Sequence, residues 1–513
     1  MATETEVITS WPSTSTSPWS QPPPLFGPSL PAGPAPPTGQ APSSSPVPET
    51  LPSMPPERDP LGLDSWAGQY YKTIPITYGV ELQFFIPVII GDKPDPHNSD
   101  GRTDDRFVRR FKAGEDSRPE TVVNQVINDI VVALRIVSQV ETWTYPGPPY
   151  PKRAVVEAMD QEAQSILRGG AYSQWVVEAA PALALRRDRF SDIYTWVAVK
   201  VKSSKRNSTI EGHFDPIAKV IFTLRWAFRL RLPSTTSLSV HVGELTRDID
   251  SYETCPVWFR RFCTLWWFIE THIFLLSHWR RRRNGKCLPL TQHSVLKRMS
   301  DEELARELEK GHQGASFAHL YEQMHYIMPS AITKRERDEV EFIWRAKDAK
   351  TLCQKLLVHK VELVNMGFGN DFLAMNHVEG RGSLGFQGFC EGADAYSSRK
   401  NNDGETGTIE FRSMDGSLDP ELIYHWVTLL IRLYDISRRG KTSDIMGIIA
   451  RTQNSYGALP LMRDLGLHEQ HAFFEAAMNS PDKGETMDNI ILPRVVDNGM
   501  LPVPPWDQAC HAS

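Results

Sequence analysis

Short segments in which polar and apolar residues alternate constrain the fold of this chain more than any other feature. In residues 77–86 every even-numbered residue is apolar, while Glu81 and Gln83 occupy odd-numbered positions. The same period of two recurs in residues 196–202, 238–242 and 409–412. Strict alternation indicates strands that pack one face on a core and leave the other face open. The four segments therefore predict a mostly antiparallel sheet with one apolar and one polar face.

Long amphipathic patterns separate these strands and predict helices. They lie in residues 120–140, 214–230, 257–279 and 420–436. Pro119 suits the first turn of the first helix, and Asp419 followed by Pro420 suits the start of the last. We expect these helices to cover the apolar face of the sheet, so that the polar face forms a cleft. The predicted class is α+β, with a sheet whose outer face is merely solvated as the alternative.

The first part of the chain differs in composition from the rest. Residues 1–60 hold 17 of the 39 prolines, together with runs of serine and threonine. Such a segment buries too little apolar area to offset its ordering entropy, so we expect residues 1–63 to be a disordered tail. A solvated spacer is one use of this tail, and docking of its polyproline-like pieces to an SH3-type partner is the alternative.

We expect residues 64–440 to form the main domain, and residues 441–513 to form a helical and extended C-terminal segment. Within the main domain, residues 300–358 are strongly charged and open with Ser300 and Glu303 at the spacing of a capping box. A solvated helical insertion is the expectation for this charged segment, with a lid over the cleft as the alternative.

The charge balance bears on possible binding partners. The chain has 62 Asp and Glu against 56 Lys and Arg, and this net charge of -6 excludes a bulk positive field for nucleic acid. The basic run 280–283 suits the C-terminal end of a helix, although a nucleic-acid contact or a nuclear-localisation signal uses the same residue types. We expect no nucleic-acid partner.

The cysteines and the apolar segments indicate the cellular context. The six cysteines are scattered and form no C-x-x-C pair, which argues against a disulfide scaffold or a zinc ribbon. The first ten residues lack the basic and apolar regions of a signal peptide. The longest apolar stretch, 262–279, contains Glu270 and two histidines, so a buried helix fits it better than a membrane span. We expect a cytoplasmic protein, with the nucleus as the alternative, and no membrane partner.

The polar positions of the predicted strands form a set of chemically active groups. They are Glu81, His241, Glu410 and Arg412. Crowded carboxylates repel one another unless a cation neutralises them, and oxygen ligands with one imidazole suit Mg²⁺ or Mn²⁺. A neighbouring arginine suits a phosphate or a carboxylate. This set predicts phosphoryl chemistry on a nucleotide.

Three stretches around these residues resemble the amidoligase family, which has many fungal members. They are residues 78–84, 238–243 and 408–420, the last with Glu-Phe-Arg followed by Gly-x-Leu-Asp-Pro. Order and spacing agree from residue 74 to residue 438, including Arg283-Asn284 after a long helix and Asn376 before the last strand. The resemblance implies a fold similar to that of glutamine synthetase and the glutamate–cysteine ligases.

The resemblance also implies an activity, the ATP-dependent joining of a small-molecule or peptide carboxylate to an amine through an acyl phosphate. ATP and Mg²⁺ are the implied cofactors. On this basis Glu81, His241 and Glu410 hold the metal. Arg412 and Lys200 are then catalytic through their positive charge. The residues implied in nucleotide or substrate binding are Gln83, Arg283, Asn284 and Asn376.

Several positions depart from the family pattern. Gln83 and Ser239 stand where the family has a second carboxylate and a first imidazole, and Ala180 stands where it has an aspartate. Lys200 replaces a further carboxylate. A lysine ammonium about 4 Å from a divalent cation is repelled by it, with an energy of about 8 kcal/mol at an effective dielectric constant of about 20. Either Lys200 neutralises nucleotide phosphates in a working ligase, or the chain is a non-catalytic nucleotide- or metabolite-binding descendant that acts as an interaction protein.

Overall fold

The computed structural model describes most of the chain after residue 74. The described residues are 75–95, 104, 106–114, 117–138, 142–144, 174–180, 193–233, 235–244, 255–277, 281, 287–311, 328, 330–358, 382–386, 408–452 and 457–479. All of them belong to one compact unit, residues 59–513. The tail expected in residues 1–63 lies outside the described residues, and so does the end of the chain from residue 480.

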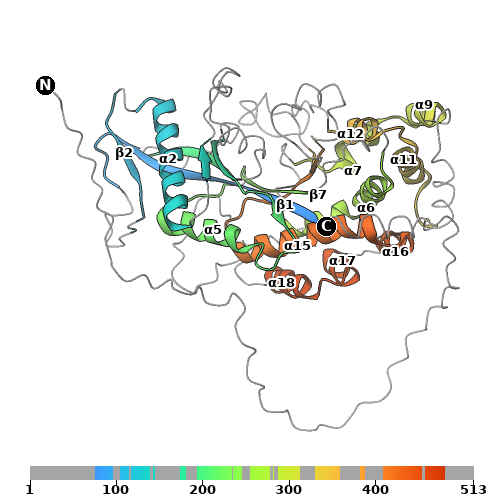
Figure 1. Ribbon diagram of the computed structural model, residues 1–513. Helices are drawn as coiled ribbons and strands as arrows, with labels where there is room; N and C mark the ends of the chain where they lie inside the picture. Colours follow the sequence, from blue (N-terminus) through green and yellow to red (C-terminus); the bar gives the residue numbers. More distant parts are fainter. Residues whose placement is uncertain are drawn as a thin grey trace, which may run out of the picture. The chain divides into compact units, whose positions relative to one another are not determined.

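An open, mostly antiparallel sheet runs through this unit (Figure 1). Its strands are β1 Ile76–Ile90, β2 Arg109–Phe111, β3 Thr142–Thr144, β4 Trp175–Ala179, β5 Tyr194–Lys202, β6 Arg206–Asn207, β7 Ser237–Glu244, β8 Leu384–Gly385 and β9 Ile409–Asp415. The main order is β3-β4-β5-β1-β7-β9-β8, with β2 and β6 also paired to β1. Only the β1–β2 and β3–β4 pairs are parallel among the described strands. The four strands predicted from alternation are therefore confirmed as β1, β5, β7 and β9.

The register of the central strands explains why one face of the sheet is apolar throughout. Leu82 of β1 lies opposite Val201 of β5 and Leu238 of β7, and all three side chains are buried. Because side chains on paired strands share a face when their residues are directly opposite, the even-numbered residues of β1 continue into the apolar positions of its neighbours. The odd-numbered residues, including Glu81, necessarily share the other face.

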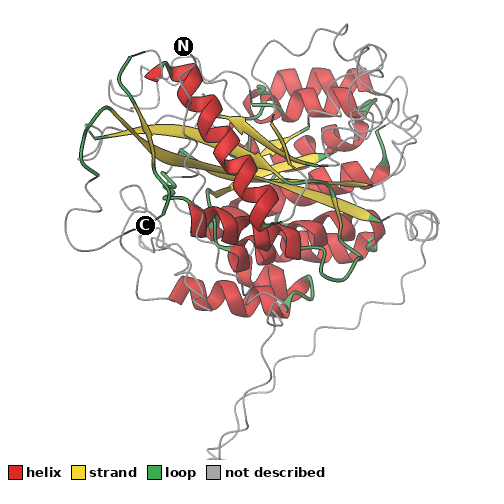
Figure 2. Ribbon diagram, turned by 60° about the vertical axis from the view of Figure 1, so that its left-hand side comes forward, coloured by secondary structure: helices red, strands yellow, loops and turns green. Residues whose placement is uncertain are grey.

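Four helices supply most of the core on the apolar face. They are α2 Pro119–Val137, α5 Asp215–Ala227, α6 Val257–Ile273 and α15 Pro420–Arg439. Their buried side chains and the even-numbered residues of β1 form one continuous hydrophobic cluster. Figure 1 shows α5 and α15 on one side of β1 and β7, and the turned view of Figure 2 shows a long helix crossing the strands at an angle. The predicted α+β class is confirmed.

The helix expected at residues 257–279 is shorter than predicted. It ends at Ile273, and the next turn tightens into a 3-10 helix, η3 Phe274–Leu276. Its aromatic side chains cover β9, since the rings of Phe262 and Trp266 lie 5.8 and 5.3 Å from that of Phe411. Within the described residues, no helix is both long enough and apolar enough to cross a membrane.

The sequence signal at the start of α15 is also confirmed. The Asp419 carboxylate accepts hydrogen bonds from the backbone N–H groups of Glu421 and Leu422, at 2.9 and 3.3 Å. Pro420 occupies the first turn, where a missing N–H costs nothing. The N-cap bears on the polar face of the sheet because α15 begins five residues after β9 ends. The cap therefore helps to fix the direction in which the chain leaves β9, the strand that carries Glu410.

The charged segment 300–358 differs from the expectation of a solvated insertion. Its helices are α9 Asp301–Gly311, α11 Lys334–Arg345 and α12 Ala349–Leu356, preceded by the short α7 Leu290–His293 and α8 Val295–Arg298. The predicted capping box is present, because Glu303 N donates to Ser300 Oγ at 3.2 Å and Ser300 N donates to Glu303 Oε2 at 2.8 Å. However, Val340 and Trp344 of α11 are buried in the main core.

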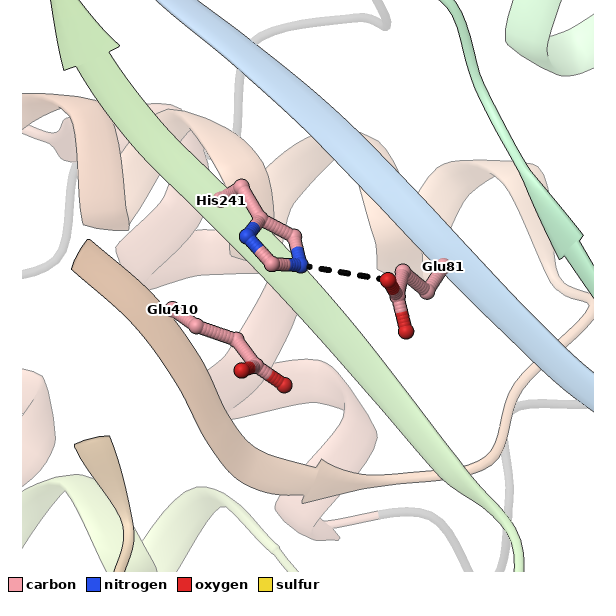
Figure 3. Close-up of side chains that lie close together, drawn as sticks. All are labelled: Glu81, His241 and Glu410. Carbon is pink, nitrogen blue, oxygen red and sulfur yellow. Dashed lines mark ion pairs between the residues drawn. The ribbon is translucent and has the colours of Figure 1, made fainter. Parts of the chain in front are cut away.

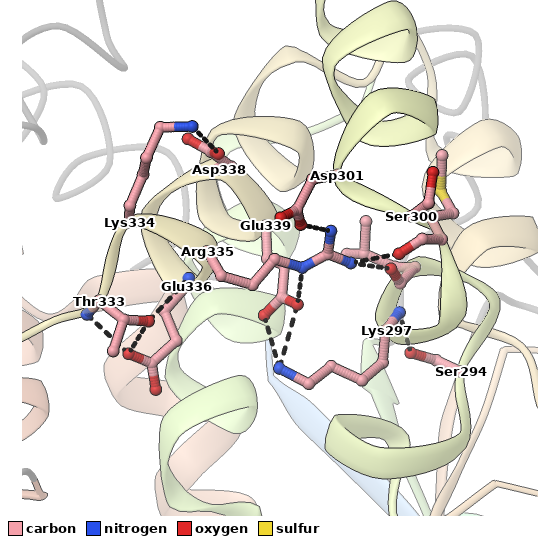
Figure 4. A network of polar contacts seen from close by, with 12 residues as sticks. Ser294, Lys297, Ser300, Asp301, Thr333, Lys334, Arg335, Glu336, Asp338 and Glu339 are labelled. Carbon is pink, nitrogen blue, oxygen red and sulfur yellow. Dashed lines mark hydrogen bonds and ion pairs between the residues drawn. The ribbon is translucent and has the colours of Figure 1, made fainter.

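Charge pairing makes that burial possible (Figure 4). The Glu339 carboxylate is completely buried, and it accepts hydrogen bonds from Lys297 Nζ at 3.1 Å, Arg335 Nε at 2.8 Å and Trp267 Nε1 at 3.1 Å. Arg335 also pairs with Asp301 at 2.8 Å. Beyond α15, helices α16 Thr442–Thr452, α17 Ala458–Asp464 and α18 His468–Asn479 add a helical layer.

Candidate active site

Three potential ligand residues converge on the polar face at the centre of the sheet. Glu81 comes from β1, His241 from β7 and Glu410 from β9 (Figure 3). One donor atom from each lies within 4.8 Å of the other two. The register produces this meeting, because His241 is paired directly with Glu410 and lies diagonally from Glu81 through its pairing with Gly79. The convergence expected from the alternating pattern is therefore present.

His241 has an incompletely satisfied ring. Its Nε2 lies 3.4 Å from Glu81 Oε1, which is long for a hydrogen bond, and this buried nitrogen has no hydrogen-bond partner within the described part of the chain. Burial alone lowers the pKa of His241, but the carboxylates of Glu81 and Glu410 outweigh that effect and raise it. The raised pKa favours the protonated ring, which pairs with these carboxylates, and loss of the proton would free a nitrogen lone pair for a metal.

Arg412 and Glu410 form a forked ion pair on β9. Arg412 Nε donates to Glu410 Oε1 at 2.7 Å, and Nη2 donates to the second carboxylate oxygen. Burial raises the pKa of Glu410, but Arg412 and His241 together hold it below its ordinary value. The pair keeps the carboxylate ionised and orients the guanidinium over the same face.

Because Gly385 has no side chain, it gives the Arg412–Glu410 ion pair room on this face of the sheet. It lies on β8 directly opposite Glu410. A Cβ at this position would come within 2.4 Å of Arg412 Nη2 and 2.8 Å of Glu410 Oε2. Any larger residue must therefore push the fork aside. The sequence gives no sign of the role of Gly385, because a two-residue strand carries no alternating pattern.

Two lysines of β5 extend the cluster toward β4. Lys200 Nζ lies 2.7 Å from Glu178 Oε1 and 3.5 Å from Glu81 Oε2. Lys202 Nζ lies 3.1 Å from Glu178 and 3.9 Å from Glu81. Both ammonium groups are closer to Glu178, a residue that the sequence analysis missed. The available sequence signal was the short apolar run just before Glu178. Pairing of this segment with β5 places the Glu178 carboxylate opposite Lys200.

His241 and the two lysines together determine the charge state of Glu81. Burial raises the pKa of Glu81, but His241, Lys200 and Lys202 more than offset it and hold the pKa well below the ordinary range. Burial lowers the pKa of Lys200, whereas Glu81 and Glu178 raise it to above its usual value. Both groups are therefore charged across the physiological pH range.

The remaining predicted residues are placed as follows. Gln83 shares the polar face, but its Oε1 accepts hydrogen bonds from Ser237 Oγ at 2.9 Å and from Ser237 N at 3.2 Å. Ser239, opposite Glu81, is buried and offers only a hydroxyl. Ala180 continues the β4–β5 pairing through its N–H, which donates to Ala198 O at 2.9 Å. Three residues expected to bind nucleotide or substrate, Arg283, Asn284 and Asn376, lie outside the described residues.

Arg281, from the basic run after α6, hydrogen-bonds to the backbone next to the site. Its side chain is 1% exposed, and it donates to the Arg412 carbonyl oxygen from Nε at 3.0 Å and from Nη2 at 2.6 Å. A third bond reaches the Thr236 carbonyl at 3.3 Å. This guanidinium is therefore occupied by backbone carbonyls of the β7 and β9 region rather than presented to a nucleic acid.

The donor set fits a divalent cation. Two carboxylates and one imidazole are ligands that Mg²⁺ and Mn²⁺ accept. The three donor atoms lie within 4.8 Å of one another, so small side-chain movements would bring all three to a single ion. Apart from its 3.4 Å contact with Glu81, the buried His241 Nε2 has no hydrogen-bond partner among the described residues, and this is the observation that favours such an occupant. The positive charge of Lys200 would repel a bound cation, but its ammonium nitrogen lies closer to Glu178 (2.7 Å) than to Glu81 (3.5 Å). Glu81 therefore remains able to bind a metal.

Comparison with known proteins identifies no relative, since no family model, curated protein or solved structure matches this chain.

Proposed function

We propose that this chain is an ATP-dependent carboxylate–amine ligase of the amidoligase type, built on a sheet similar to that of glutamine synthetase. The observation that supports the proposal is the convergence of Glu81, His241 and Glu410 beside Arg412 on one sheet face. These residues come from the three stretches that resemble the family, on three adjacent strands, and the resemblance requires them to meet.

The proposed reaction has two steps. A carboxylate oxygen of the first substrate attacks the γ-phosphorus of ATP, which forms an acyl phosphate and releases ADP. The amine nitrogen of the second substrate then attacks the carbonyl carbon, loses its proton and expels phosphate, which forms the amide. Both steps build negative charge on phosphate oxygens, so the main requirement of the site is positive charge fixed in place.

The chain's own residues meet that requirement in distinct ways. Glu81, His241 and Glu410 would hold Mg²⁺, which when bound neutralises phosphate oxygens. Arg412, held in place by its forked pair with Glu410, would contribute positive charge beside a phosphate or a substrate carboxylate. Lys200 supplies a further ammonium, positioned by Glu178 at the edge of the same cluster.

A second candidate function is binding of a nucleotide or metabolite without catalysis. The specific observation in its favour is charge balance: the carboxylates of Glu81, Glu178 and Glu410 already face three cations. A cluster that is neutral by itself does not need a metal. In that case the sheet face serves as a binding surface of an interaction protein, and its ligand affinity is independent of Mg²⁺.

Calorimetric titration of ATP into the full-length chain, with Mg²⁺ and with a chelator, tests the ligase proposal. We expect ATP to bind in Mg²⁺, and the affinity to fall about tenfold or more in the chelator. Glu410→Gln should cause a similar loss in Mg²⁺, whereas Glu309→Gln, on the exposed face of α9, should not. Equal affinity with and without Mg²⁺ would support the non-catalytic nucleotide binder, and no ATP binding at all would contradict both the ligase and the nucleotide binder.

A further inference from the structure

Glu270 is a buried carboxylate that the proposed reaction does not use. It lies in the last turn of α6 and is completely buried. Its Oε2 accepts hydrogen bonds from Thr291 N at 2.9 Å and from Thr291 Oγ1 at 2.7 Å, and its Oε1 accepts one from Leu290 N at 2.8 Å. A buried charge is costly unless hydrogen bonds compensate it, and these three donors at the start of α7 do so.

The same carboxylate also bonds to the segment that carries β8. Ser383 Oγ donates a hydrogen bond to Glu270 Oε1. The indole Nε1 of Trp266 lies 3.3 Å from each of these two oxygens. Ser383 is completely buried, so its hydroxyl is shielded from bulk water. Glu270 therefore ties the start of β8 to α6.

Ser383 in turn supports Arg412 of the candidate site. The Ser383 carbonyl oxygen accepts a hydrogen bond from Arg412 N at 2.8 Å, and the Ser383 N–H donates to Leu288 O at 2.9 Å. Gly382 O accepts a bond from Arg412 Nη1 at 3.4 Å. The backbone of residues 382 and 383 therefore holds both the main chain and the guanidinium of Arg412.

The pairing between β8 and β9 is short. Its register consists of Leu384 opposite Phe411 and Gly385 opposite Glu410. So short a strand contributes few ladder hydrogen bonds, and a side-chain bond at its start therefore carries more weight. Gly385 is also the residue that gives the Arg412–Glu410 pair its room. A shift of β8 along β9 would change both that room and the carbonyl groups that Arg412 contacts.

We propose that Glu270 and Ser383 are positioning residues, which hold β8, and through it Arg412, in place. A carboxylate that only stabilised the start of α7 would have no need of Ser383, since Leu290 and Thr291 already supply three donors. The value of a fixed Arg412 to a phosphate or a substrate carboxylate rests on the proposed function. The link from Glu270 to Arg412 is independent of any ligand.

Ser383→Ala in the full-length chain tests the proposal, because it removes the hydroxyl and leaves the backbone carbonyl. We expect hydrogen exchange of the Arg412 amide, measured by mass spectrometry on peptides from residues 409–415, to become about tenfold faster. We expect the affinity for ATP in Mg²⁺ to fall about fivefold in calorimetry, because the guanidinium loses its fixed position. Ser383→Cys keeps a weak donor and should give intermediate values, and it makes the same test if Ser383→Ala does not fold.

Thr291→Val is the matched control. It removes a hydroxyl donor from the other oxygen of the same carboxylate and leaves the Ser383 bond in place. We expect it to lower the melting temperature about as much as Ser383→Ala does, and to change neither the exchange of the Arg412 amide nor the affinity for ATP.

Three results would overturn the proposal. They are equal changes in Thr291→Val and Ser383→Ala, unchanged amide exchange in the Ser383 variants, and unchanged ATP affinity in Ser383→Ala when wild type binds ATP. Absence of ATP binding by wild type contradicts the proposed function alone. Faster exchange in Ser383→Ala but not in Thr291→Val would then still uphold the link from Glu270 to Arg412.

Discussion

Lys200 and Glu178 face each other directly across β5 and β4, with the ammonium nitrogen 2.7 Å from a carboxylate oxygen. This pair shows how a lysine is accommodated beside the carboxylates of the site. Without Glu178, the remaining ion pair of Lys200 among the described residues would be the one with Glu81, a proposed metal ligand 3.5 Å away. Glu178 therefore provides the closer counter-charge for Lys200, and it leaves Glu81, the proposed metal ligand on the adjacent strand, less tightly paired.

Gly385→Ala should disrupt the site with little effect on the fold. The new methyl group would overlap the ends of the Arg412 and Glu410 side chains, which can move, rather than backbone. We expect the affinity for ATP in Mg²⁺ to fall about tenfold, because the forked pair loses its geometry. Calorimetry and thermal melting measure the two effects. Gly457→Ala, whose Cβ would meet only Pro460 at 3.8 Å, is the control, and an unchanged ATP affinity in Gly385→Ala would refute the role assigned to the fork.

Glu339→Gln should destabilise the protein far more than substitution of a surface acid. The change removes the buried counter-charge of Lys297 and Arg335, and we expect the free energy of unfolding to fall by about 3 kcal/mol. Asp338→Asn breaks only an ion pair with Lys334, which is 91% exposed, and should cost about 0.5 kcal/mol or less. Urea unfolding of both variants makes the comparison. Similar losses in the two would show that the α11 network is solvated after all.

His425 of α15 should make stability fall as the pH decreases. Burial lowers the pKa of His425 from 6.5 to about 4, and its ring stacks on Phe473 with centroids 4.2 Å apart. Above pH 6.5 both folded and unfolded chains carry a neutral ring. Between pH 6.5 and 4 only the unfolded chain takes up the proton, so up to about 3 kcal/mol of stability is lost over that range.

The contribution of His425 has to be measured as a difference between two proteins. Burial raises the pKa of Asp419 to about 6, which makes stability rise as the pH decreases over nearly the same range. Both proteins contain Asp419, so comparison of wild type with His425→Phe isolates the imidazole. We expect the variant to lose less stability than wild type from pH 7 to pH 5 in urea unfolding. Parallel curves would rule out the proposed shift, and the exposed His468→Gln is the control.

The alternating pattern predicted the parts of the site that lie on long strands. Because side chains alternate strictly along a strand, the shared face of Glu81, His241 and Glu410 followed once β1, β7 and β9 were recognised as neighbours. Glu178 escaped prediction because β4 has only five residues and begins with three buried apolar ones, which gives no alternation. Gly385 escaped because its importance lies in the side chains of another strand.

The charged segment shows a different limit of sequence patterns. The composition of residues 300–358 predicts a solvated segment, because it gives the number of charged residues but not which of them form ion pairs. The partners of Glu339 include Lys297, 42 positions away, and Trp267, 72 positions away. Such pairings depend on tertiary packing, and they allow a polar sequence to bury one face of α11.

The most direct test of the ligase account is ATP binding by Lys200→Glu in the presence of Mg²⁺. If Lys200 supplies positive charge to the nucleotide phosphates, reversing its charge beside Glu178 and Glu81 should weaken ATP binding about tenfold or more. A decayed metal site would behave in the opposite way, because a carboxylate at position 200 partly rebuilds the acidic ligand set of the family. Calorimetric titration of ATP into wild type and Lys200→Glu separates the two: a loss of affinity is the predicted result, and an unchanged or higher affinity would contradict the account.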